Sequence, residues 1–151
     1  MNPTADDATP RTAVGAYPVS DAVAPVTILV ADDNERFRGG MVRALRRRPG
    51  VEVVADVENG ARALEEIRAL RPQLVLVDAR MPIVDGLTVA RTVTADPDLA
   101  ATKVLLLSAR HDRVLVEDAR VAGAVACLDK SDSRREICDA VLAFAPGHEG
   151  P

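Results

Sequence analysis

Two stretches decide the fold: VTILVADD at Val26–Asp33 and LVLVDARMPIVDG at Leu74–Gly86. Each begins with a short, continuous apolar run, which is typical of a strand buried on both faces of a sheet. Each run ends in aspartate, with Asp32 and Asp33 after the first and Asp78 after the second. The sequence therefore predicts two parallel strands whose carboxyl ends carry acidic side chains.

Outward from these stretches, apolar runs alternate with segments whose apolar residues recur at helical spacing. Five such repeats predict an α/β protein, a doubly wound five-stranded parallel sheet, (βα)5, in the flavodoxin-like order 2-1-3-4-5. No G-x-G-x-x-G follows the first strand, which disfavours a dinucleotide-binding fold. The predicted strands are Val26–Ala31, Val51–Val57, Leu74–Val77, Lys103–Leu107 and Ala124–Leu128.

The composition excludes several classes of function. Of the 151 residues, 48% are apolar and 28% charged, as in an ordinary globular domain. Aromatic residues make up only 2%, which argues against a base-stacking surface and an aromatic-lined ligand pocket. The net charge of −4 gives no electrostatic footprint for nucleic acid.

Three segments are expected along the chain. Residues 1–25 contain four prolines and no periodicity, which predicts a disordered tail. Residues 26–145 form the domain, and residues 146–151 form a short second tail. We find no apolar run of membrane-spanning length and no signal peptide, and Cys127 and Cys138 lie outside any metal-ligand spacing. We therefore expect a cytoplasmic protein that does not associate with membranes.

Polar residues follow four of the predicted strands, and parallel topology brings them to one edge of the sheet. Singly, each has an ordinary structural role as a helix cap, a turn residue or a solvated charge. Three carboxylates crowded on neighbouring strands, however, would destabilise the fold without a cation, and Mg²⁺ is the typical hard ion for such oxygens. An aspartate there can also act as a nucleophile toward phosphorus. The residues are Asp32, Asp33, Asp78, Ser108 and Lys130.

At these positions the chain resembles the receiver domain of two-component response regulators. The resemblance covers about Val26 to Ala145, and its motifs occur in order at four strand ends. The matching segments are VADD (Val30–Asp33), VDARMPIVDG (Val77–Gly86), LLSAR (Leu106–Arg110) and GAVACLDK (Gly123–Lys130).

The resemblance implies a role for each matching residue. Asp78 corresponds to the phosphoacceptor. Asp33 corresponds to the direct Mg²⁺ ligand, Asp32 to the residue that holds the ion through water, and the backbone carbonyl of Arg80 to a third protein ligand. Two further positions, Ser108 and Lys130, correspond to the residues that bind the phosphoryl group.

The same resemblance implies partners. A sensor histidine kinase or phosphotransfer protein would donate the phosphoryl group, and a downstream protein would respond to a change in the last two βα units. After Lys130 only one helix and a short tail remain, so we expect a stand-alone receiver that is a regulatory phosphoprotein and not an enzyme. A homodimer through the last two βα units is left open.

Three departures from the family pattern stand out. Cys127 occupies the position of a common aromatic residue, so the usual coupling between that residue and Ser108 is not expected. Ser131 follows the lysine where proline is common. Arg80 and Arg110 flank the acceptor and the hydroxyl, which suggests that they slow hydrolysis of the phosphate; two solvated arginines are the ordinary alternative.

Two rival functions are considered. A phosphate-independent interaction module is favoured slightly by Cys127 and Ser131, and opposed by the intact acidic and lysine positions. A phosphatase of the haloacid dehalogenase kind requires D-x-D at its nucleophile, whereas Arg80 lies two residues after Asp78.

Overall fold

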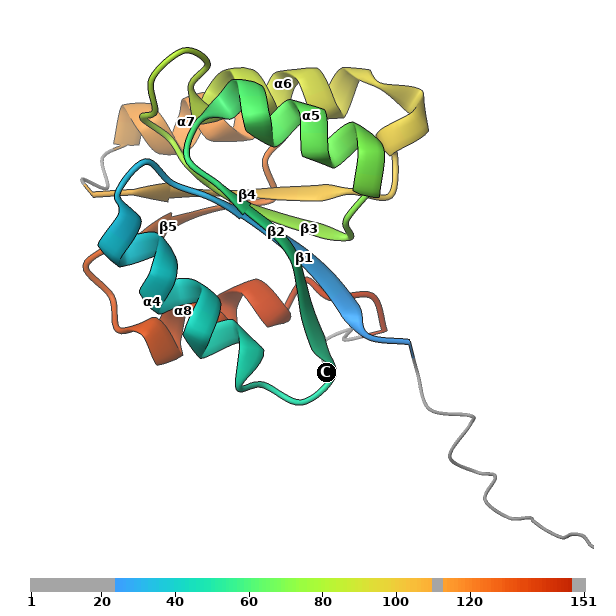
Figure 1. The fold of residues 1–151 in the computed structure, drawn as a ribbon. Helices are drawn as coiled ribbons and strands as arrows, with labels where there is room; N and C mark the ends of the chain where they lie inside the picture. Colours follow the sequence, from blue (N-terminus) through green and yellow to red (C-terminus); the bar gives the residue numbers. More distant parts are fainter. Residues whose placement is uncertain (1–23, 110–112, 148–151) are drawn as a thin grey trace, which may run out of the picture.

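The computed structural model describes residues 24–109 and 113–147, which form one parallel sheet covered by helices on both faces (Figure 1). The strand order is β2-β1-β3-β4-β5, so the predicted topology is confirmed. The strands are β1 (Val26–Ala31), β2 (Val51–Val57), β3 (Leu74–Asp78), β4 (Lys103–Ser108) and β5 (Ala126–Asp129).

The last strand begins later than the sequence predicts. Gly123 has a positive φ of 94°, and the amide of Ala124 still donates to the carbonyl of Ala119 in the preceding helix, at 3.0 Å. Ala124 therefore belongs to the helix exit, and β5 starts at Ala126. Its apolar character predicted a strand residue because the turn signal lay only in the glycine.

Two apolar layers sandwich the sheet. Buried residues of α4 and α8 pack on one face, and those of α5, α6 and α7 pack on the other (Figure 1). The helices are α4 (Glu35–Arg46), α5 (Gly60–Leu70), α6 (Gly86–Ala95), α7 (Arg113–Val121) and α8 (Arg134–Leu142), with a 3₁₀ turn η1 at Pro97–Leu99.

β3 lies at the centre of this arrangement. All five of its residues are buried, and it pairs in parallel with β1 on one side and β4 on the other. Ala31 pairs with Val77, and Asp78 pairs with Leu107. The carboxyl ends of the three strands therefore meet, which brings Asp32, Asp78 and Ser108 to one edge.

The residues that cap the helices decide whether Asp32 or Asp33 has the ordinary role of a helix cap. Asn34 caps α4, since its Oδ1 accepts the amide of Phe37 at 2.9 Å. Capping of this helix by Asp32 or Asp33 is therefore wrong, because the helix begins only at Glu35, directly after Asn34. Ser133 caps α8 in a capping box with Glu136.

Some expectations lie outside the described residues. These are residues 1–23 of the tail predicted at residues 1–25, Arg110, and residues 148–151 of the second predicted tail. None of the helices in the described ranges has the length and apolar character that crossing a bilayer requires.

Candidate functional site

Three carboxylates meet at the carboxyl edge of the sheet. Asp32 directly follows β1 and is 0% exposed, Asp78 ends β3 and is 7% exposed, and Asp33 is exposed. One carboxylate oxygen from each lies within 4.8 Å of the others. Parallel pairing of β1 with β3 creates this cluster, because both strands stop at the same level of the sheet.

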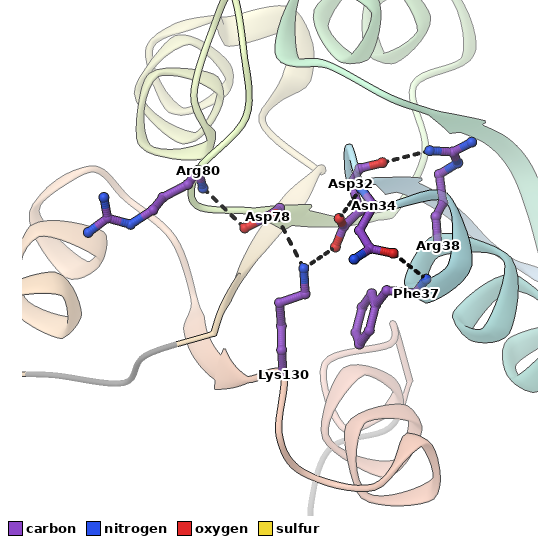
Figure 2. A network of polar contacts seen from close by, with 7 residues as sticks. All are labelled: Asp32, Asn34, Phe37, Arg38, Asp78, Arg80 and Lys130. Atoms are coloured by element: carbon purple, nitrogen blue, oxygen red, sulfur yellow. Dashed lines mark hydrogen bonds and ion pairs between the residues drawn. The ribbon is translucent and has the colours of Figure 1, made fainter.

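Lys130 enters the cluster from the end of β5. Its Nζ lies 2.8 Å from Asp32 Oδ2 and 3.3 Å from Asp78 Oδ2, so one ammonium bridges two carboxylates (Figure 2). The amide of Lys130 donates to the carbonyl of Ser108 at 2.9 Å, which fixes the start of the side chain beside β4. The structure thus brings four of the predicted site residues together, with Ser108, 4% exposed, at the end of the neighbouring strand.

The pKa values reflect this crowding. Burial raises the pKa of the Asp78 carboxyl, and the charge of Asp32 raises it further, against the lowering effects of the Arg80 amide and of Lys130. Burial lowers the pKa of Lys130, but its contacts with Asp32 and Asp78 outweigh burial and raise it. Lys130 is therefore held in its charged form, while the Asp78 carboxyl resists ionisation.

Asp32 is supported by the N-cap residue of α4 and by one residue within that helix, both of which sequence analysis missed. The amide of Asn34 donates to Asp32 Oδ1 at 2.8 Å, and Arg38 Nη1 donates to the carbonyl of Asp32 at 2.7 Å. Arg38 Nε also donates to Asp56 Oδ1 on β2, at 3.2 Å. The available signal was spacing: Arg38 lies four residues after the cap, where a helical side chain leans back toward the N-terminus.

The loop after β3 is packed against glycine backbones. The amide of Arg80 donates to Asp78 Oδ1 at 3.1 Å, so Asp78 also closes a local turn, as its ordinary alternative role predicted. A Cβ at Gly86 would overlap the carbonyl of Asp78, and one at Gly60 would overlap the carbonyl of Val84. The loop is therefore held on two sides.

Three residues that the sequence singled out, Cys127, Ser131 and Arg80, lie on β5 and in the loops that follow β5 and β3. Cys127 is half-buried on β5 opposite Leu106 and packs with the apolar layer beneath α5, α6 and α7. Ser131 donates from both N and Oγ to Asp129 Oδ1, at 2.9 and 2.7 Å. The guanidinium of Arg80 points away from Asp78 (Figure 2).

The acidic cluster could hold a metal ion. Its donors are hard carboxylate oxygens, which suit Mg²⁺, and one of them, on Asp33, is exposed to solvent. Asp32 Oδ2 is buried and, within the described ranges, accepts no well-aligned hydrogen bond, although Lys130 is close to it. Three carboxylates face one ammonium, so a divalent cation would balance the remaining charge.

Comparisons with known proteins identify relatives of this arrangement. The family model of the response regulator receiver domain matches residues 28–142. The transcriptional regulatory protein NarL of Mycobacterium tuberculosis is 42% identical over 124 residues, which cover 82% of this chain and 56% of that protein. LnrK of Bacillus subtilis is 33% identical over 122 residues, covering 81% and 54%. The chain spans about half the length of these curated relatives.

Solved structures agree with this assignment. The signal receiver domain of the response regulator NarL from Mycobacterium tuberculosis superposes with a TM-score of 0.78 at 42% identity, covering 83% of this chain and 99% of that one. A structure of the CheX–CheY–BeF₃–Mg complex from Borrelia burgdorferi, at 21% identity and a TM-score of 0.74, shares the fold; it covers 82% of this chain and 92% of that one. The chain belongs to the response regulator receiver domain family of two-component signalling proteins.

Proposed function

We propose that this domain is a phosphorylation switch that accepts a phosphoryl group on Asp78 from a sensor histidine kinase or phosphotransfer protein. The observation that carries the proposal is the cluster itself. Asp78 lies within 4.8 Å of the carboxylates of Asp32 and Asp33, and 3.3 Å from the ammonium of Lys130. Acidic oxygens for a cation and an ammonium for a phosphoryl oxygen therefore surround one nucleophilic carboxylate.

The proposed phosphoryl transfer is a displacement at phosphorus. An Asp78 carboxylate oxygen forms a bond to phosphorus while the N–P bond of the phosphohistidine breaks, and the departing imidazole keeps the electron pair and takes a proton from solvent. Asp33 directly, Asp32 through water and the carbonyl of Arg80 would hold Mg²⁺, which supplies neutralisation of the phosphoryl charge when bound.

Lys130 and Ser108 then connect the phosphate to the rest of the fold. The lysine exchanges its contact with Asp78 for a phosphoryl oxygen, and the hydroxyl of Ser108 donates to another. Because these residues end β5 and β4, the change passes to the last two βα units, where a downstream protein or a second copy of the domain binds. We propose residues 26–145 as the folded unit that makes this response.

Intact mass spectrometry tests the proposal. We expect an adduct of one phosphate after incubation with acetyl phosphate and Mg²⁺, labile to acid and hydroxylamine, and absent without the metal or in Asp78→Asn. Asp85→Asn serves as a matched control, because it removes an exposed carboxylate that caps α6 and keeps the cap. Absence of an adduct on the folded wild-type protein would contradict the proposal and favour a phosphate-independent interaction module.

A more specific proposal concerns the side chain of Arg80 and the lifetime of the phosphate on Asp78. We propose that its side chain turns toward the phosphorylated acceptor and shields the phosphate from water. Arg80→Ala is expected to hydrolyse its phosphate about 3-fold faster, the size of one exposed charge contact. An unchanged lifetime leaves Arg80 as a solvated residue of the loop.

A further inference from the structure

Phe37 lies directly against the ammonium that bridges the acidic cluster. This residue is in the first turn of α4, and Lys130 Nζ lies 4.5 Å from the centroid of its ring (Figure 2). That distance is within the range of a cation–π interaction. The described residues include one other aromatic side chain, Phe144, which lies after the end of α8. Helical spacing alone assigns Phe37 to the apolar core, and it does pack there.

A second cation holds the ring from α8. The guanidinium carbon of Arg134 lies 5.6 Å from the same centroid. Arg134 also lies across the backbone of α4, because a Cβ placed on Gly40 would overlap its guanidinium. Arg134 is the first residue of α8, after the Ser133 cap that fixes the start of that helix. The ring is therefore fixed between a lysine of the site and an arginine of a helix packed against α4.

The ring of Phe37 limits the conformations that the side chain of Lys130 can adopt. The lysine side chain is 15% exposed and reaches both carboxylates from a flexible four-carbon stem. A ring face on the remaining side restricts the ammonium to the position between Asp32 and Asp78. We infer that Phe37 is a positioning residue for Lys130, which orders its ammonium at the acidic cluster and connects it through Arg134 to α8.

The consequence for phosphorylation rests on the proposed function. An ordered ammonium meets the incoming phosphoryl group without first losing rotamer entropy, so the ring should speed acceptance. Loss of one partly exposed cation–π contact corresponds to a slowing of about 3-fold.

Side-chain NMR of the lysine tests the placement directly, in the unphosphorylated full chain. Phe37→Leu keeps an apolar side chain at the site and removes the ring, and Phe37→Tyr restores it. We expect the Cε protons of Lys130 to lose their ring-current shift and gain mobility in Phe37→Leu, and to recover both in Phe37→Tyr. Phe144→Leu is the matched control, since it removes a ring from the same apolar layer without touching Lys130.

Kinetics with acetyl phosphate at saturating Mg²⁺ completes the test. Support requires slower acceptance in Phe37→Leu, normal acceptance in Phe37→Tyr and Phe144→Leu, and a smaller loss in Arg134→Gln. Unchanged Lys130 resonances in Phe37→Leu overturn the inference, and so does an altered lysine with unchanged acceptance. Should the wild type accept no phosphate, the proposed function fails, and the NMR comparison alone decides whether the ring orders the lysine.

Discussion

The centre of the sheet, at β3, and one of its outer strands, β5, differ in packing. All five residues of β3 are buried, whereas none of the four residues of β5 is. The flanking helices show the same contrast: α4 buries four residues, and α7 buries only Ala119 among its nine. The acidic pair of Asp32 and Asp78 is therefore fixed on the packed side, while Lys130 comes from the loosely packed side. This difference in packing lets the part of the fold that carries Lys130 change its conformation while Asp32 and Asp78 keep their positions.

Truncation of matched leucines measures the contrast most directly. Leu76 on β3 and Leu128 on β5 face the same apolar layer, with Leu76 fully buried and Leu128 half-buried. We expect Leu76→Ala to lower the free energy of unfolding by about 4 kcal/mol and Leu128→Ala by about 2 kcal/mol, measured by urea denaturation. Equal losses would show that β5 is as tightly packed as β3. Amide hydrogen exchange on the unmodified protein gives an independent check, with faster exchange expected in α7 than in α4.

The same contrast explains how much the sequence could predict. Uninterrupted apolar runs such as VTILVA predict buried strands, and five βα repeats leave few topologies, so the sheet order followed. The weakly packed β5 was also the strand whose start was misplaced, because half-buried residues give a weaker pattern. Parallel topology brought the acids to one edge, but side-chain contacts across elements did not follow from spacing. The contacts of Arg38 with Asp32 and of Phe37 with Lys130 depend on rotamers in three dimensions.

Metal binding should stabilise the packed side selectively. If Asp33 is a direct ligand, Mg²⁺ at ten times its dissociation constant raises the free energy of unfolding by about 1.4 kcal/mol. Urea titrations at fixed Mg²⁺ measure this increase. Asp33→Asn removes an exposed carboxylate, so the variant should fold normally and lose the increase. A response to Mg²⁺ that persists in Asp33→Asn would place the ion elsewhere.

The raised pKa of Asp78 predicts a smaller, pH-dependent effect. An acid whose pKa is higher in the folded than in the unfolded protein costs stability when ionised, at pH above its folded pKa. The cost shrinks as the pH falls through that value, and it is absent below the unfolded value. Asp78→Asn without metal should therefore be more stable than wild type at pH 7.

The advantage of Asp78→Asn should disappear on acidification, which thermal denaturation across pH would show. Asp85→Asn is the control, because Asp85 is exposed at the cap of α6 and the change keeps that cap. A gain in Asp78→Asn that stays constant down to acid pH would mean that the lost carboxylate acts through packing and not through its charge.

The smallest effect is expected at Ile83, in the loop that follows Asp78. Its φ is 72°, its side chain is 77% exposed, and the loop is held by Gly60 and Gly86 on either side. The amide of Val84 donates to the carbonyl of Pro82 at 2.8 Å, so Ile83 is the centre of a γ-turn. A β-branched residue at this positive φ costs about 1–2 kcal/mol, and glycine loses about 0.5–1 kcal/mol of the relief through its greater chain entropy. Ile83→Gly should therefore stabilise the protein by about 0.5 kcal/mol.

Arg71→Gly gives the matched comparison for Ile83. Arg71 has a φ of 47° at the end of α5, away from the acidic cluster, and lacks the β-branch. A smaller gain there, measured by urea denaturation, would assign the difference to the branched side chain. Destabilisation by Ile83→Gly would instead show that the loop does not hold Ile83 in this conformation in solution. Since neither burial nor backbone preference favours isoleucine at this position, the gain would mean that the loop after Asp78 tolerates backbone strain.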